Sequence, residues 1–172
     1  MSSLRNKRRV AIQALYQMDN SGPQDDSLVS NEAIREFIEA DEIPEKVFEE
    51  GLTLARETWS HREAADADLA PLTPEWPLHR QPVVDRNLLR LAWYEMNRAG
   101  IPPKVVISES VDLAREFSTE QSPSFINGVL DRLYHDMIEA SNPTNESTPE
   151  EESTPNEEST PTEESTPTDT PS

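Results

Sequence analysis

The segment from Asp85 to Arg98 is apolar on almost every side of a predicted helix, and it restricts the possible folds more than any other feature. Leucine, alanine, methionine and aromatic side chains occupy nearly the whole circumference between Leu88 and Met96. Such a helix is stable in water only where other helices cover it on several sides. We therefore expect it to lie at the centre of the molecule.

The rest of the first 140 residues repeats its apolar side chains with the period of α-helices, and strand-like alternation is scarce. Further helices are predicted over about 4–18, 30–40, 44–65, 105–117 and from residue 122 to about 138. The pattern is broken by Pro71, Pro74, Pro77 and Pro82. The predicted fold is all-α, with six or seven helices in two packed bundles, about 1–75 and 76–140, of one domain.

A different composition begins near the C-terminus. The motif Glu-Ser-Thr-Pro recurs every six residues, starting at Glu146, Glu152, Glu158 and Glu164, and no repeat carries an apolar side chain that could pack on its neighbour. A segment without buried apolar surface does not recover the entropy lost on ordering. Residues 141–172 are therefore predicted to form a disordered acidic tail outside the domain of residues 1–140.

The charge of the chain is unevenly distributed. The net charge is −19, but residues 141–172 hold nine acidic and no basic residues, whereas residues 1–18 hold four basic and no acidic ones. The four are Arg5, Lys7, Arg8 and Arg9. Because the two ends differ so strongly, the overall acidity does not exclude a nucleic acid as a partner.

The first predicted helix places its polar side chains on one stripe. At about 100° per residue, this stripe holds Arg5, Arg9, Gln13 and Tyr16, with Arg8 beside it. The opposite stripe holds Leu4, Ala11, Leu15 and Met18. We expect the polar stripe to face solvent, where arginine could bind phosphate and tyrosine could stack on a base. Spacing alone does not separate this interpretation from an ordinary solvated helix face.

Two further features have both a structural and a functional interpretation. Glu95 lies among apolar residues of the central helix, and we expect a salt bridge or a capping contact between two helices there rather than a catalytic role. The last helix begins near Ser122 and Pro123, so its first backbone N–H groups could attract an anion. Within it, Asn127 and Gly128 indicate either close packing at the glycine, with the asparagine bonded to backbone, or a ligand contact.

Signatures of enzymes are absent from the sequence. It has no cysteine, three scattered histidines (His61, His79 and His135) and four glycines, too few for a glycine-rich phosphate loop. We therefore predict a non-enzymatic protein without a metal or cofactor. No run of about 18 apolar residues exists, and the basic N-terminus is not followed by an unbroken apolar stretch, so we expect a cytoplasmic protein without a membrane partner.

Three stretches together resemble the NusB family, in the same order as in that family and over most of residues 5–134. They are Arg8–Gln17, Val84–Met96, and Ile101–Arg115 with Phe125–Asp131. Residues 20–75 match the family pattern weakly. Three positions depart from it: Ser108 replaces a common asparagine, Ser118 replaces a frequent glycine, and Gln121 replaces a frequent acidic residue.

The resemblance implies an all-α protein that binds single-stranded boxA-type RNA together with NusE, a ribosomal protein of the small subunit. The complex would promote transcription antitermination on ribosomal RNA operons and would contact RNA polymerase indirectly. Together with the polar stripe, the resemblance predicts an RNA face. Its residues are Arg5, Lys7, Arg8, Arg9, Gln13, Tyr16, Gln121, Ser124 and Phe125. It also predicts that NusE docks near Asp85, Arg86 and Tyr94.

Two alternatives remain open at this point. A similar helical module precedes the methyltransferase domain of certain ribosomal RNA cytosine methyltransferases, so the chain could be a stand-alone relative that binds RNA without methylating it. It could also be a helical adaptor that binds only proteins, with solvated arginines.

Overall fold

The computed structural model describes residues 3–21, 30–38 and 43–142, all within one compact unit, Met1–Asn142. This described part contains seven α-helices, two short 3-10 helices and no strand, which confirms the predicted all-α class. The α-helices are α1 (Ser3–Ser21), α2 (Asn31–Phe37), α3 (Glu45–Ser60), α4 (Arg62–Leu69), α5 (Val83–Asn97), α6 (Pro103–Phe117) and α7 (Ser122–Ser141). The 3-10 helices are η3 (Ala70–Leu72) and η4 (Leu78–Arg80). Beyond Asn142, the predicted acidic tail lies outside the described residues.

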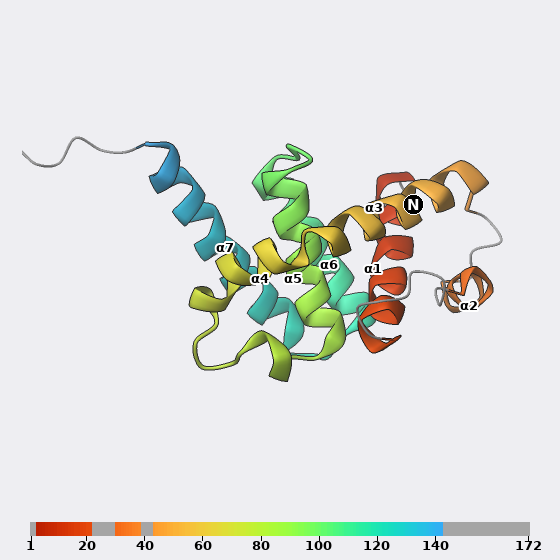
Figure 1. Ribbon diagram of the computed structural model, residues 1–172, viewed down its shortest axis with the longest axis horizontal. Helices are drawn as coiled ribbons and strands as arrows, with labels where there is room; N and C mark the ends of the chain where they lie inside the picture. The colour runs from red at the N-terminus through yellow and green to blue at the C-terminus, as the bar shows by residue number, and fades with distance from the viewer. Residues whose placement is uncertain (1–2, 22–29, 39–42, 143–172) are drawn as a thin grey trace, which may run out of the picture. The chain divides into compact units, whose positions relative to one another are not determined.

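Helix α5 is the central element. It packs against α1, α3, α4, α6 and α7, and Figure 1 shows it between α1 on one side and α7 on the other. Every residue from Asn87 to Trp93 is buried. The prediction of a central helix is therefore confirmed, because only contacts on several sides could cover a helix that is apolar all round.

Helix α1 is covered almost as completely as α5 over its middle turns. All six residues from Val10 to Leu15 are buried, because α3, α5 and α2 pack around this segment. The predicted division into one apolar and one solvent-facing stripe is therefore wrong at Gln13 and Leu4, and also at the flanking Arg8, which is buried. Gln13 is only 9% exposed, whereas Leu4, at the free start of the helix, is 61% exposed.

The contact between α1 and α3 depends on a glycine. A Cβ atom at Gly51 would lie 2.6 Å from the Cβ of Val10 and 2.8 Å from the carbonyl oxygen of Lys7. No other residue would allow the two helices to approach so closely. The sequence had instead suggested close packing at Gly128, where a Cβ atom would meet nothing within 4 Å, and that prediction is wrong.

Two other local predictions need correction. The side chain of Asn127 donates to Asp131 Oδ2 at 3.3 Å rather than bonding to backbone. The predicted helix over 44–65 is divided into α3 and α4 at His61, whose backbone (φ −100°, ψ 6°) leaves the helical region. The ring Nδ1 of His61 lies 2.8 Å from the carbonyl oxygen of Glu57. This side chain therefore caps a carbonyl group in the last turn of α3.

Candidate nucleic-acid interface

Arg8 forms a buried ion pair with the central helix. Its Nε donates to both carboxylate oxygens of Glu95, at 2.9 and 3.1 Å, and both side chains are at most 7% exposed. The expected salt bridge at Glu95 is thus confirmed, but the expectation that Arg8 faces solvent is wrong. A carboxylate within the core needs a compensating cation, and Arg8 supplies it. Burial raises the pKa of Glu95, while the charge and hydrogen bond of Arg8 act in the opposite direction.

Arg5 and Arg9 form ion pairs with α6. Arg5 donates to Asp112 and lies 3.4 Å from Glu109, and Arg9 Nε donates to Glu116 at 2.7 Å. Their side chains are 29% and 15% exposed, respectively. The predicted stripe of free guanidinium groups is therefore a row of ion pairs between helices, and acidic partners offset much of its charge.

These pairs also fix how the helices run. Arg5 and Arg9 follow Asp112 and Glu116 in the same direction, so α1 and α6 run parallel, whereas the Arg8–Glu95 and Asp19–Arg86 pairs make α5 antiparallel to α1. The later turns of α1, the start of α5 and the α6–α7 connection consequently meet at one end of the molecule. Tyr16 lies on these later turns of α1 and is 42% exposed.

Asp85 holds this end together from the inside. It is fully buried and accepts hydrogen bonds from the hydroxyl groups of Ser118 and Ser122, the latter at 2.8 Å. The Ser122 hydroxyl also lies 2.7 Å from Thr119 Oγ1. Asp85 therefore fixes the α6–α7 connection and offers no surface to a partner, which corrects the prediction that it lies at a docking site. Ser118, which replaces the family's frequent glycine, supplies one of these donors.

The other two predicted partner-binding residues face different helices. Arg86 donates two hydrogen bonds to Asp19 of α1, at 2.6 and 2.8 Å, and Tyr94 donates to Glu57 of α3 at 2.7 Å. Burial and the neighbouring Glu57 carboxylate raise the pKa of Tyr94 to about 12, so the phenol remains a donor. The structure thus does not gather the three predicted docking residues into one patch, and docking by Arg86 or Tyr94 stays a prediction.

Asp19 is the centre of a second polar network. It also accepts hydrogen bonds from Asn87 at 2.8 Å and Arg90 at 3.1 Å, while Arg90 binds Asp66 of α4 with two further bonds of 2.7 Å. Burial alone would raise the pKa of Asp19. The hydrogen bonds of Arg86 and Asn87 and the positive charges of Arg86 and Arg90 outweigh burial and hold the pKa below its usual value. The network ties α1, α4 and α5 together.

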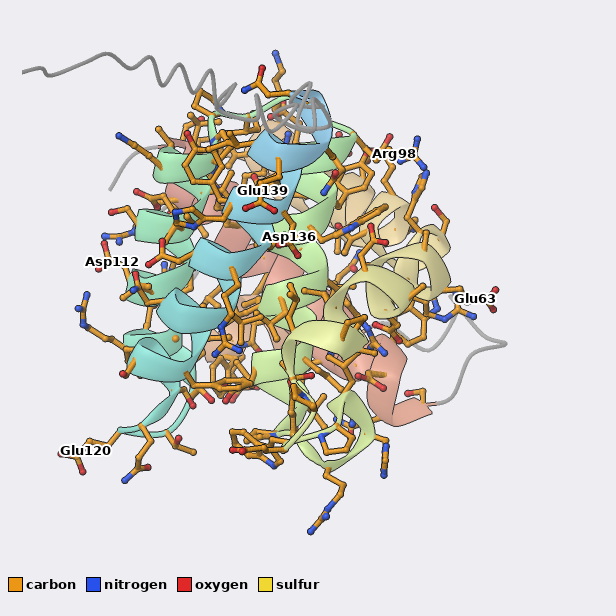
Figure 2. All side chains as sticks on the ribbon, turned by 90° about the vertical axis from the view of Figure 1, so that its left-hand side faces the viewer. Glu63, Arg98, Asp112, Glu120, Asp136 and Glu139 are labelled. Carbon is orange, nitrogen blue, oxygen red and sulfur yellow. The ribbon has the colours of Figure 1, made fainter. Side chains whose placement is uncertain are left out.

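The start of α7 presents several of the predicted RNA-binding residues. Gln121 and Ser124 are exposed, and Ser124 lines a shallow pocket with Arg115 and Asn127 between α6 and α7. Figure 2 shows Glu120 projecting from the α6–α7 connection, whereas Asp136 and Glu139 lie toward the opposite end of α7.

Phe125 is half-buried, and its ring centroid lies 4.8 Å from that of Trp76. Sequence reasoning did not select Trp76. The signal that could have identified it is a large aromatic residue inside the proline-rich break.

The described residues contain neither a cluster of metal ligands nor a membrane-spanning helix. No three histidine, aspartate or glutamate side chains there are placed to hold a metal ion. None of the helices in residues 3–21, 30–38 and 43–142 combines the length and the apolar character needed to cross a membrane.

An all-helical core that brings exposed aromatic and polar side chains to one end defines a helical binding protein. Comparison with known families identifies it further. Residues 5–135 match the model of the NusB family, and the chain belongs to this family. Its members are transcription antitermination factors rather than enzymes, which confirms the resemblance and the non-enzymatic class predicted from the sequence.

Individual relatives agree with this assignment. The transcription antitermination protein NusB of Symbiobacterium thermophilum is 39% identical over 133 residues, which cover 74% of this chain and 86% of the relative. The solved structure of T. maritima NusB is 33% identical, with a TM-score of 0.61, and the match covers 77% of this chain and 91% of that one. A crystal structure of the antitermination factors NusB and NusE in complex with dsRNA contains a chain that is 26% identical, with a TM-score of 0.64, covering 79% of this chain and 98% of that one.

Proposed function

We propose that this chain is an RNA-binding adaptor that acts with NusE in the cytoplasm. Together they would hold a single-stranded boxA-type element and promote antitermination on ribosomal RNA operons. Membership of the NusB family and the similarity to a chain from a NusB–NusE–RNA complex support this role. The observation that carries it is the meeting of the family-matching segments at one end of the molecule, where Tyr16 is 42% exposed and Ser124 is also exposed.

The proposed RNA face has two parts. Tyr16 and Phe125 stack on unpaired bases, and the neighbouring polar side chains of Gln121 and Ser124 bond to base edges or phosphates. Arg5, Lys7 and Arg9 attract phosphates along α1. Arg8 and Gln13 are buried, so they do not contact RNA directly. They support α1, the helix that carries the other basic residues and Tyr16.

NusE enters this proposal as the second component of the adaptor. A chain that holds RNA and a ribosomal protein at once raises the local concentration of each for the other. The affinity for a boxA-type RNA should therefore be higher in the presence of NusE than without it. A scrambled RNA of the same composition should gain less, because it lacks the bases that the face selects.

The test is a titration of labelled RNA with the full chain, with and without NusE. Three RNAs are compared: a boxA-type single strand, its scrambled counterpart, and the boxA-type sequence as a duplex. We expect the single strand to bind best, because a duplex keeps its bases paired and unavailable for stacking. Equal affinity for the duplex would contradict the single-strand preference, and this comparison is needed because the similar solved complex contains dsRNA.

A pair of variants tests the position of the face. Tyr16→Ala removes a side chain that is 42% exposed, and Ile138→Ala, near the opposite end of α7, removes one that is 40% exposed. Loss of one stacking contact should weaken RNA binding on the order of 10-fold in Tyr16→Ala, with no change in Ile138→Ala. If the wild-type chain binds NusE but none of the three RNAs, the chain is a purely protein-binding adaptor and the proposed function is wrong.

A further inference from the structure

Trp76 differs from the other two tryptophans of the chain. Trp59 and Trp93 are 9% and 4% exposed, and Trp93 Nε1 donates to Asp68 at 2.8 Å. Trp76 is 37% exposed, and no residue of the described part accepts a hydrogen bond from its indole N–H. A large apolar ring is thus held at the surface with its polar edge unused.

The backbone around Trp76 is fixed. Its N–H donates to the carbonyl oxygen of Thr73 at 3.2 Å, and its own carbonyl accepts from Gln81 Nε2 at 2.8 Å. Pro74 and Pro77 restrict the backbone on both sides. Binding of a ligand to this ring would therefore require little additional ordering of the segment, and little free energy would be lost in that way.

The Trp76 ring also has a fixed neighbour. Its centroid lies 4.8 Å from that of Phe125, with the two planes inclined by 60°. Phe125 in turn packs against the main core and belongs to the first turn of α7. The two rings form a rigid aromatic corner between the proline-rich connection and the start of α7.

An arginine close to Trp76 in the sequence offers this corner one positive charge. His79 and Arg80 follow Trp76 on η4 and are exposed, and Arg80 forms no ion pair with any described residue. The first turn of α7 adds backbone N–H groups without partners inside the helix, including that of Ser124. Glu75, next to Trp76, and Glu120, five residues before Phe125, are also exposed and oppose the binding of an anion.

We propose that Trp76 stacks on an unpaired base of the bound RNA and, with Phe125, extends the RNA face beyond α1 and the α6–α7 connection. This inference rests on the proposed function, because it requires the chain to bind single-stranded RNA. An aromatic ring followed four residues later by an exposed arginine without an ion pair suits a base and its adjacent phosphate: the ring would stack on the base, and Arg80 would bind the phosphate.

The first experiment uses the tryptophan as its own reporter. Single-stranded RNA is added to the full chain with NusE, and binding is followed both by anisotropy of the labelled RNA and by tryptophan emission. We expect RNA to quench the emission of the wild-type chain, because a stacked base contacts Trp76 directly. In Trp76→Phe, which keeps a ring against Phe125, RNA should still bind, but the remaining emission of Trp59 and Trp93 should not change.

The second experiment measures affinity. Trp76→Ala should weaken binding of the single strand on the order of 10-fold, whereas Trp76→Phe should bind within about 3-fold of wild type, because phenylalanine also stacks. Ile138→Ala is the matched control, since its side chain is 40% exposed and lies 13 residues after Phe125 on α7. Circular dichroism and thermal unfolding check that each variant is folded.

A charge variant separates RNA from a basic protein partner at the same corner. Glu75→Gln removes a negative charge next to Trp76, so it should tighten RNA binding, whereas a basic protein partner would bind more weakly to this variant. The inference is overturned if the wild-type chain binds RNA while its emission is unchanged and Trp76→Ala binds as well as wild type. If the wild-type chain binds no RNA, the proposed function fails, and this inference fails with it.

Discussion

The first turns of α1 and the corner around Trp76 both carry arginine. Only at the corner is the arginine charge not offset by an acidic partner among the described residues. On α1, Arg5, Arg8 and Arg9 are paired with acidic residues of α5 and α6. At the corner, Arg80 is exposed and forms no ion pair within the described residues. A cluster of basic residues in a sequence therefore overstates the positive potential of a surface when neighbouring helices supply the counter-charges.

The difference follows from how far each charge lies from solvent. A buried guanidinium costs several kcal/mol unless a carboxylate compensates for it, so Arg8 requires Glu95. An exposed arginine stays hydrated, so it needs no carboxylate partner and can bind a phosphate. In the proposed function, Arg8 therefore contributes mainly to stability, and RNA is recognised mainly by the aromatic side chains and the less completely paired cations.

The largest expected effect is on the buried pair. Arg8→Ala leaves the Glu95 carboxylate buried without a partner and should destabilise the chain by about 3–5 kcal/mol. Arg9→Ala, which removes a partly exposed pair, should cost less than about 1 kcal/mol. Urea unfolding monitored by circular dichroism measures both. A loss in Arg8→Ala as small as that in Arg9→Ala would remove the distinction between a structural and a surface arginine.

The next effect concerns the support of α1 by α3. Gly51→Ala places a Cβ atom 2.6 Å from that of Val10, so the two helices must separate, and we expect a loss of about 1–3 kcal/mol. Gly128→Ala meets nothing within 4 Å and replaces a helical glycine, so it should stabilise the chain by up to about 1 kcal/mol. Thermal unfolding of the pair provides the measurement. Equal shifts in both variants would contradict the proposed close approach at Gly51.

The third prediction concerns pH and the Asp19 network. Because the folded pKa of Asp19 lies below its ordinary value of 3.8, this group adds stability above pH 3.8 that is lost as the pH falls through the folded pKa. The stability difference between wild type and Asp19→Asn should therefore shrink below pH 3.8. The pKa of Glu95 is raised above 4.5, so its contribution to stability has the opposite sign. That contribution falls as the pH rises and the Glu95 carboxyl ionises. Unfolding curves recorded from pH 3 to 7 would show a constant difference if Asp19 contributed nothing.

The fourth prediction compares the two kinds of arginine in RNA binding. Arg80→Ala should lower the slope of log affinity against log salt concentration by about 0.7, the value for one lost phosphate contact on a single strand. Arg9→Ala should change this slope less, because Glu116 already offsets its charge. Titrations at four salt concentrations measure both slopes. A larger change in Arg9→Ala would reverse the comparison and make α1, rather than the corner around Trp76, the main phosphate path.

The smallest effect is expected from the acidic tail. Deletion of residues 143–172 removes nine acidic and no basic residues. We expect affinity for the boxA-type RNA to stay within about 2-fold and nonspecific binding to rise slightly, because less negative charge repels other RNAs. Competition with bulk RNA measures both. Loss of specific binding would show that the tail contributes to the RNA face.

The sequence by itself determined the elements and the class of the protein. The all-round apolar character of residues 88–96 was enough to predict a central helix, and the ordered family motifs were enough to predict the NusB family. The same all-round pattern from Val10 to Leu15 could have shown that α1 is also buried, but the stripe of polar residues on that helix concealed it.

Only the tertiary structure decided which charges and rings are accessible. The pairing of Arg8 with Glu95 and the contact of Trp76 with Phe125 join residues separated by 87 and 49 positions, respectively. Local periodicity reports which face of a helix is apolar. It does not report which neighbouring helix supplies a carboxylate, because that depends on the direction and register with which helices far apart in the sequence pack together.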